Sequence, residues 1–209
     1  MTVSRFDNAA CDTLAGCINE IERSTDVELV IVVRGRSANY AHSDYLFGFL
    51  VALVVLVFLI FSPFPFPEFL VPIDIAVAFV VGAVISWRSN FLRRLFSREK
   101  FRNDAVRTAA AAMFYEAGIA NTNAEMGVLI YLSLMERRLE LIADRGVLKK
   151  VPAQEWNQHQ FDLHEVGKNP DAQNFQNAIE RFGELLAEHV PATGENPNEL
   201  PDKPRFELK

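Results

Sequence analysis

The fold of this chain is decided by the stretch Tyr45-Leu-Phe-Gly-Phe-Leu-Val-Ala-Leu-Val-Val-Leu-Val-Phe-Leu-Ile-Phe61, and no charged residue occurs from Tyr45 to Pro67. In a helix, about 20 apolar residues span a hydrocarbon core of about 30 Å. A buried helix of a soluble protein is rarely apolar on every face over such a length. The stretch therefore predicts a transmembrane helix.

A second apolar segment extends from Phe69 to Trp87 and contains Pro72 and Asp74 near its start. Both would lie in the first helical turn, where proline is tolerated and a carboxylate reaches the solvated interface. The segment predicts a second full span, with a re-entrant segment as the alternative. The proline-rich linker before it cannot continue a regular helix. Residues 45–87 are therefore predicted to form a transmembrane hairpin.

The charge next to this hairpin predicts its orientation. Residues 88–102 contain six Lys or Arg residues against the single acid Glu99, whereas the loop between the spans contains none. The positive-inside rule then places both termini in the cytoplasm. Apolar residues alternate with these cations, so we also expect this juxtamembrane segment to rest on anionic lipid. The net charge of −6 argues against nucleic-acid binding.

The residues before the hairpin predict one part of a split α/β domain. Residues 1–42 contain an amphipathic helix that ends near Arg23, followed by the β-branched strand Val27–Val33. One helix and one strand cannot build a core alone. Their partners must therefore follow the hairpin in the sequence.

Residues 103–190 supply those partners. In order, they predict the helix 104–117, the strands 127–133 and 138–143, the helix 151–161 and a final helix capped by Asn169. We expect the turn at Glu136 and Arg137 to be exposed, and the proline-rich tail 191–209 to be disordered. The pattern predicts an α/β sandwich with at least three strands and four helices, interrupted by the membrane hairpin.

Familiar catalytic motifs are not found in this sequence. Cys11 and Cys17 lie about 9 Å apart along one predicted helix, too far for a disulfide, and are expected to be free thiols. No glycine-rich phosphate loop, Cys/His zinc spacing or Gly-x-Ser-x-Gly elbow occurs. Enzyme activity is therefore uncertain from the residues alone.

The order of several motifs resembles the TPM domain family, which is named for thylakoid-lumen, photosystem-repair and receptor-associated membrane proteins. The motifs are Val27-Glu-Leu-Val-Ile-Val-Val33, Phe114-Tyr-Glu-Ala-Gly118-Ile, Gly127-Val-Leu-Ile-Tyr131, Leu139-Glu-Leu-Ile-Ala-Asp-Arg-Gly146-Val and Trp156. The resemblance covers about residues 10–40 and 100–190. It implies an α/β/α sandwich with a small mixed sheet. A membrane hairpin inside the domain resembles a bacterial subgroup, which implies a multi-pass protein of the cell inner membrane.

The resemblance also implies candidate metal ligands. Family members are associated with photosystem repair, with a reported acid phosphatase activity and, in some cases, with divalent cations. Where the family often has an Asp-Asn pair and a glycine-rich turn, this chain has Glu125 and Asp144. Together with Asp26 or Glu28 they could bind calcium or magnesium through oxygen ligands. Alternatively, Glu125 and Asp144 are solvated turn residues.

Two functional hypotheses follow from these observations. The first is a non-enzymatic, membrane-anchored interaction module that maintains other membrane proteins, with the lipid bilayer and a membrane protein or a second copy as partners. The second is a divalent-cation-dependent phosphatase, which relies on the resemblance and on the metal ligands. A transporter is a weaker third, because two spans with one peripheral acid cannot line a pore without oligomerising.

Overall fold

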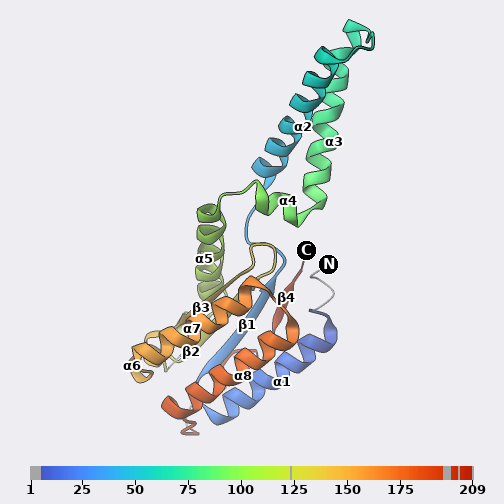
Figure 1. Ribbon diagram of the computed structural model, residues 1–209. Helices are drawn as coiled ribbons and strands as arrows, with labels where there is room; N and C mark the ends of the chain where they lie inside the picture. The colour runs from blue at the N-terminus through green and yellow to red at the C-terminus, as the bar shows by residue number, and fades with distance from the viewer. Residues whose placement is uncertain (1–5, 123, 195–198, 202, 209) are drawn as a thin grey trace. The chain divides into compact units, whose positions relative to one another are not determined.

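The computed structural model of this protein describes residues 6–122, 124–194, 199–201 and 203–208. The chain forms two compact units (Figure 1). The first combines residues 1–37 with residues 103–209, and the second consists of residues 38–102. Two segments that are far apart in the sequence thus fold together, and the intervening residues form a unit of their own.

The first unit contains a four-stranded mixed sheet with the strand order β3-β2-β1-β4. Its strands are β1 (Glu28–Arg34), β2 (Gly127–Ser133), β3 (Arg138–Ala143) and β4 (Arg205–Glu207). β1 is parallel to both β2 and β4, whereas β2 and β3 are antiparallel. The register places Glu28 opposite Gly127 and Arg34 opposite Ser133. β1, which precedes residues 38–102, therefore pairs with β2, which follows them.

Helices cover both faces of this sheet (Figure 1). One face packs against α1 (Asn8–Ser24), α7 (Ala153–Lys168) and α8 (Ala172–His189), and near this face lies the short α6 (Arg145–Lys150). The other face packs against α5 (Glu99–Glu116) and the short η3 (Ile119–Asn121). β1 and β2 are apolar on both faces and almost fully buried, as expected for central strands between two helical layers. The predicted α/β class with a small mixed sheet is confirmed.

The helical layer of α1 and α8 is fixed by a close contact. The Asp7 side chain caps α1 by accepting a hydrogen bond from the Ala10 amide at 3.0 Å. A Cβ atom at Gly183 of α8 would lie only 2.5 Å from Cγ1 of Ile21 in α1. The missing side chain lets the two helices approach over the sheet.

α8 begins later than expected, with Asp171 rather than Asn169 at its N-cap.

The prediction of a disordered tail over 191–209 is wrong for residues 205–207, which form β4. Phe206 and Leu208 pack against the core, and Arg34 forms an ion pair of 2.9 Å with Glu207. The many prolines of the tail predict disorder. Composition alone does not show that a short segment with two apolar residues can pair with an open strand edge. The edge of β1 provides that partner.

Phe206 is expected to account for most of the stability that β4 adds. Phe206→Ala should lower the free energy of unfolding by about 1–3 kcal/mol, since a half-buried aromatic ring leaves the core. Glu207→Gln is the matched control and should cost less than about 1 kcal/mol, because its ion pair is solvent-exposed. Urea unfolding of the full chain in detergent would measure both. Equal effects of the two changes would show that the strand is not anchored through Phe206.

The second unit is a helical hairpin. It contains α2 (Ala41–Phe61), the short η2 (Glu68–Leu70), α3 (Val71–Arg88) and α4 (Asn90–Leu95). By length and composition, α2 and the segment 68–88 could each cross a membrane. Within their most apolar windows only 17% and 11% of the residues are buried inside the protein. A core helix of a soluble protein would be mostly buried, so these helices present their apolar surfaces outward.

Two glycines bring α2 and α3 together. A Cβ atom at Gly48 would lie 2.6 Å from the carbonyl oxygen of Phe79, and one at Gly82 would lie 2.9 Å from Cβ of Val51. Small residues at facing positions allow the backbones of apolar helices to pack closely. The hairpin is therefore a packed pair and not two independent helices.

A buried ion pair closes the base of this hairpin. Asp44, in the first turn of α2, accepts hydrogen bonds from Nη2 of Arg93 at 2.7 Å and from Nε of Arg93 at 3.0 Å. The Ser86 hydroxyl of α3 donates to the same carboxylate at 2.8 Å. Arg93 and Asp44 are only 5% and 6% exposed. The bidentate geometry and the third donor satisfy the buried carboxylate and tie α2, α3 and α4 to one another.

Removing one member of this ion pair should destabilise the hairpin strongly. Arg93→Ala leaves the Asp44 carboxylate buried without its cation, and the expected loss is about 3 kcal/mol or more. Arg98→Ala, at an exposed position five residues later, is the matched control and should change little. Thermal unfolding of both variants in the same detergent would measure the difference. The double change Asp44→Ala and Arg93→Ala should recover part of the loss, and no difference between Arg93→Ala and Arg98→Ala would contradict the clamp.

Candidate functional site

Asp26, one of the predicted metal ligands, is engaged by protein donors. Its Oδ1 accepts a hydrogen bond from the Thr193 amide and its Oδ2 accepts one from the Thr193 hydroxyl, both at 2.8 Å. Asp26 is buried at 8% exposure just before β1. These bonds tie the segment after α8 to the start of β1. Asp26 therefore fits a structural role better than that of a metal ligand.

Glu125 and Asp144 belong to two loops that the structure brings together. The Gly146 amide donates to the carbonyl oxygen of Glu125 at 2.9 Å, and the Asp144 amide donates to that of Gly127 at 2.8 Å. A Cβ atom at Gly146 would lie 2.5 Å from the Glu125 oxygen, so the close approach requires glycine. Glu125 has a left-handed backbone with φ 56° and an exposed side chain. The two carboxylates are thus on neighbouring loops at one end of β2.

One oxygen of Asp144 has an unusual environment. Oδ1 caps α6 by accepting a hydrogen bond from the Arg145 amide at 2.7 Å. Oδ2 is buried and has no hydrogen-bond partner among the described residues. A buried carboxylate oxygen without a donor costs about 1–3 kcal/mol or more. This oxygen is the feature of the predicted site that best fits a bound cation.

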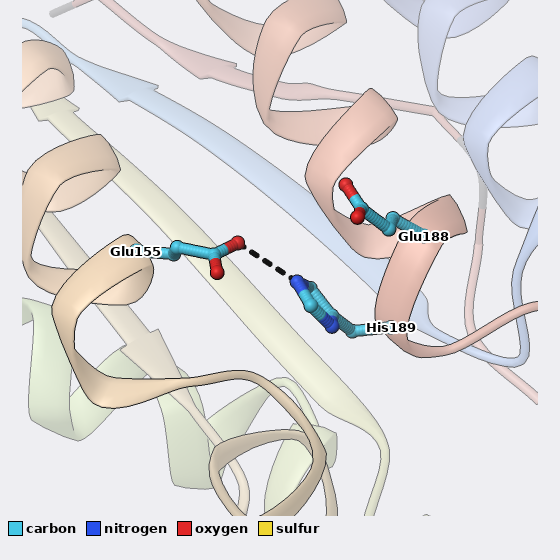
Figure 2. A group of neighbouring side chains, drawn as sticks. All are labelled: Glu155, Glu188 and His189. Carbon is cyan, nitrogen blue, oxygen red and sulfur yellow. Dashed lines mark hydrogen bonds and ion pairs between the residues drawn. The ribbon is translucent and has the colours of Figure 1, made fainter.

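A different set of side chains forms the one group of three possible ligands that the described residues bring within 4.8 Å: Glu155, Glu188 and His189 (Figure 2). Nε2 of His189, at the end of α8, lies 2.8 Å from Oε2 of Glu155 in α7. Both glutamates are exposed. The arrangement has the character of a surface ion pair between two helices, which contributes little stability. Sequence reasoning did not find it because α7 and α8 meet only through the tertiary fold.

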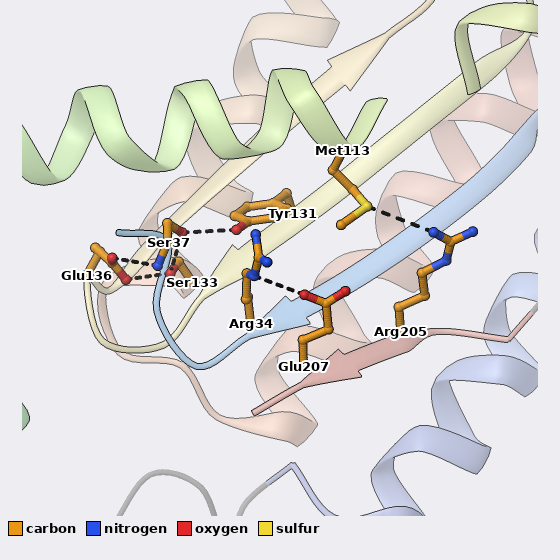
Figure 3. Close-up of polar contacts among 8 residues, drawn as sticks. All are labelled: Arg34, Ser37, Met113, Tyr131, Ser133, Glu136, Arg205 and Glu207. Atoms are coloured by element: carbon orange, nitrogen blue, oxygen red, sulfur yellow. Dashed lines mark hydrogen bonds and ion pairs between the residues drawn. The ribbon is translucent and has the colours of Figure 1, made fainter. Parts of the chain in front are cut away.

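A buried polar network lies at the carboxyl ends of β1 and β2 (Figure 3). Glu136 accepts hydrogen bonds from the Ser37 amide at 2.8 Å and from the Ser133 hydroxyl. The Ser37 hydroxyl also lies 2.8 Å from the Ser133 oxygen and 3.0 Å from the Tyr131 hydroxyl. Arg34, at the end of β1, is also hydrogen-bonded to Tyr131, and this bond raises the pKa of Arg34 above its ordinary value.

The prediction that the turn at Glu136 is exposed is wrong for this side chain, which is 5% exposed. Charge in a turn indicates solvent exposure, but here the carboxylate collects donors from Ser37 and Ser133, which lie far apart in the sequence. The network holds the end of β1 beside the end of β2, where the chain leaves the first unit. We interpret it as a structural network.

Cys17 has the properties of an inert thiol. Burial, and then the nearby Glu180 carboxylate, raise the pKa of Cys17 to about 11. The thiol donates to Oε1 of Glu180 at 3.6 Å. Because the thiolate is the reactive form of cysteine, this residue is a poor nucleophile at neutral pH.

The outer surface of the hairpin is a candidate lipid-facing surface. Large apolar side chains are exposed along both helices, among them Phe49, Val54, Phe58, Phe61, Ile73, Val77, Val80 and Val84.

The basic residues of the juxtamembrane segment 88–102 fall into two groups. Arg93 is buried in the ion pair with Asp44, and Nη1 of Arg102 donates to the Arg94 carbonyl oxygen at 2.7 Å. The side chains of Arg88, Arg98 and Lys100 are exposed.

Comparison with known proteins gives information on the fold alone. No protein-family model matches the chain, and no curated protein matches it. Among solved structures, the chain is similar to the NMR structure of the BA42 protein from the psychrophilic bacterium Bizionia argentinensis, with a TM-score of 0.57 and 14% sequence identity. The similarity covers 96% of this chain and 94% of that chain. At this identity it supports a shared fold and carries no information on activity.

The metal hypothesis predicts a calcium or magnesium response that depends on Asp144. A cation that binds only the native state raises stability by about 2.7 kcal/mol at a hundredfold excess over Kd, so the melting temperature should rise with cation and fall with EDTA. Asp144→Ala should abolish the response. Asp26→Asn should lower the baseline stability and keep the response, and Glu155→Gln, a surface carboxylate change, should affect neither. A response that survives Asp144→Ala would rule out this ligand.

Proposed function

We propose that this protein is a bilayer-anchored interaction module: the hairpin of α2 and α3 spans the membrane twice, and the α/β unit binds other proteins at the membrane surface. The observation that carries the proposal is the packed pair of apolar helices with outward apolar side chains. Such a surface is stable in contact with lipid and costly in water.

The sheet gives an independent reason for two crossings. β1 precedes the hairpin, β2 follows it, and the two strands pair in parallel over seven residues. Both ends of the hairpin must therefore return to the same side of the bilayer. An even number of spans meets this condition, whereas one span would separate the two strands. The condition supports the double span, although a re-entrant second segment would also meet it.

The distribution of charge supports a cytoplasmic location for the α/β unit and both termini. Arg88, Arg98 and Lys100 are exposed after α3, whereas the loop between the helices contains no cation. Phe91 and Leu95 of α4 are exposed beside these cations. A short segment with this composition fits the anionic interface of a bacterial inner membrane.

We further propose that the chain is a TPM-like domain that maintains other membrane proteins, through a membrane-protein partner or a second copy. The α/β layers and the order of the quoted motifs support this assignment. Ser133 is bonded within the network of Glu136 and Cys17 is an inert thiol. Both residues thus have structural roles, which favours binding over catalysis.

A divalent-cation-dependent phosphatase is the second candidate, and the buried Oδ2 of Asp144 is the observation that favours it. The cation would be held by Asp144 and Glu125 and would supply a Lewis acid for phosphate oxygens. Both carboxylate oxygens of Asp26 accept hydrogen bonds from Thr193, which supports a structural role for Asp26 and leaves Asp144 and Glu125 as the better candidates.

The topology can be tested with single cysteines in a variant without Cys11 and Cys17. A cysteine at Phe64, in the loop between the helices, should react with a membrane-impermeant maleimide on spheroplasts. A cysteine at Gln173, an exposed position of α8, should react only after lysis. Labelling at Gln173 in intact spheroplasts would invert the proposed orientation. Protection of Phe64 on the outside would favour the re-entrant alternative.

A further inference from the structure

The outer edge of β3 carries main-chain groups that no described strand pairs with, because β3 is the last strand of the order β3-β2-β1-β4. The Asp144 amide donates to the Gly127 carbonyl oxygen at 2.8 Å. Asp144 and Gly127 are therefore a hydrogen-bonded pair of the antiparallel register. Along an antiparallel strand such pairs alternate with pairs whose N–H and C=O groups point away from the neighbouring strand. The N–H and C=O groups of Leu141 and Ala143 therefore turn away from β2, where they can pair with an added strand.

Helix α7 covers one part of this edge and leaves another part in a groove. Nδ1 of His164 lies 3.4 Å from the Leu139 carbonyl oxygen, and a Cβ atom at Gly167 would lie 2.8 Å from the Leu139 nitrogen. α7 therefore closes the edge at Leu139. Residues 141–143, further along β3, line a groove of about 610 Å³.

The groove has one helical wall on each side of the sheet. Arg107 of α5 lines one wall, and Leu148 of α6 with Trp156 and Gln160 of α7 lines the other. Because α7 closes the edge at Leu139, a second copy of the sheet could not pair along the whole of β3. A short extended chain needs only the open part of the edge, at residues 141–143. The shape of the groove therefore favours a peptide over a sheet-to-sheet dimer.

The wall formed by α5 is charged. Arg107 is exposed on this wall. Burial raises the pKa of Glu140, in spite of the opposing effects of Arg138, His164 and Arg107. Glu140 and the exposed Asp104 are acids that line the groove beside Arg107. An acidic side chain of a ligand would find a partner in Arg107.

The opposite wall is largely apolar. Besides Gln160 it contains Leu148, which is 49% exposed, and Trp156, which is 8% exposed. In an added strand, successive side chains would point alternately to the two walls. The charged wall and the apolar wall therefore fit a strand in which charged and apolar side chains alternate.

We infer that this groove binds a single extended peptide as a fifth strand beside β3, with acidic side chains facing Arg107 and apolar side chains facing Leu148 and Trp156. Main-chain hydrogen bonds to Leu141 and Ala143 supply affinity, and the two walls supply specificity. The inference rests on the proposed function as an interaction module and names its binding surface.

Two synthetic peptides test this inference on the full chain in detergent micelles. Both have nine residues and a fluorescent label; one alternates valine with glutamate and the other alternates valine with lysine. Fluorescence polarisation should give at least about tenfold tighter binding of the glutamate peptide, which corresponds to about 1.4 kcal/mol. Arg107→Glu should reverse this preference, because the charge of the wall is inverted. Equal binding of both peptides, or of neither at millimolar concentration, would overturn the inference.

A proline at the edge tests the main-chain contacts. Ala143→Pro removes an outward N–H group without removing a bond to β2, so both peptides should bind at least about tenfold more weakly. The melting temperature of the variant shows whether it is folded. If Ala143→Pro does not fold, the inference is tested by whether Arg107→Glu prefers the lysine peptide to the glutamate peptide. A folded Ala143→Pro variant that binds as tightly as the unchanged protein would contradict strand addition.

A photo-crosslinking amino acid in membranes separates a failure of the groove from a failure of the module. It is placed at Gln160 in the groove or at Gln173 on the exposed surface of α8. Crosslinks from Gln160 that the glutamate peptide displaces support the groove. Crosslinks from Gln173 alone would refute the groove and retain the interaction module. No crosslink from either position would count against both.

Discussion

The parallel pairing of β1 with β2 is the constraint on which the rest of this structure depends. It joins residues 28–34 to residues 127–133 across the whole helical hairpin. Neither strand can be buried without the other, because α1 and β1 alone form no closed core. The pairing creates the two faces that α1, α7 and α8 cover on one side and α5 on the other. It also requires the hairpin to begin and end on the same side of any bilayer that it enters.

The hairpin is stabilised internally by contacts of a different kind. If the hairpin lies in lipid, as proposed, apolar surface cannot drive the association of its helices, and close packing and polar bonds must do so. Gly48 and Gly82 provide the close packing, and the ion pair of Asp44 with Arg93 provides a buried polar bond at the base. The basic segment therefore has two roles. Arg93 holds the hairpin together, whereas Arg98 is exposed and is one of the cations that the proposed membrane orientation rests on.

Sequence reasoning was accurate where a pattern is local and incomplete where partners are distant. The strand pair 127–133 and 138–143 was predicted with its observed bounds, because a nearly continuous apolar run and a polar turn are local signals. Burial of Glu136 was missed, since its donors include Ser37 from the other side of the hairpin. The strand at 205–207 was missed because its partner is the edge of β1. The hydrogen bonds from Thr193 to Asp26, a predicted candidate for a cation site, could not be seen in the sequence either.

The sequence by itself determined that two long apolar segments separate the two parts of an α/β domain, because hydropathy and periodicity are properties of contiguous residues. The tertiary structure alone decided which polar groups are satisfied: Asp44 by Arg93, Asp26 by Thr193 and Glu136 by Ser37 and Ser133. It also decided that the edge of β3 lies in a groove between α5 and α7. The physical reason is that hydrogen bonding and burial depend on distances in space, which only the packing of remote elements sets.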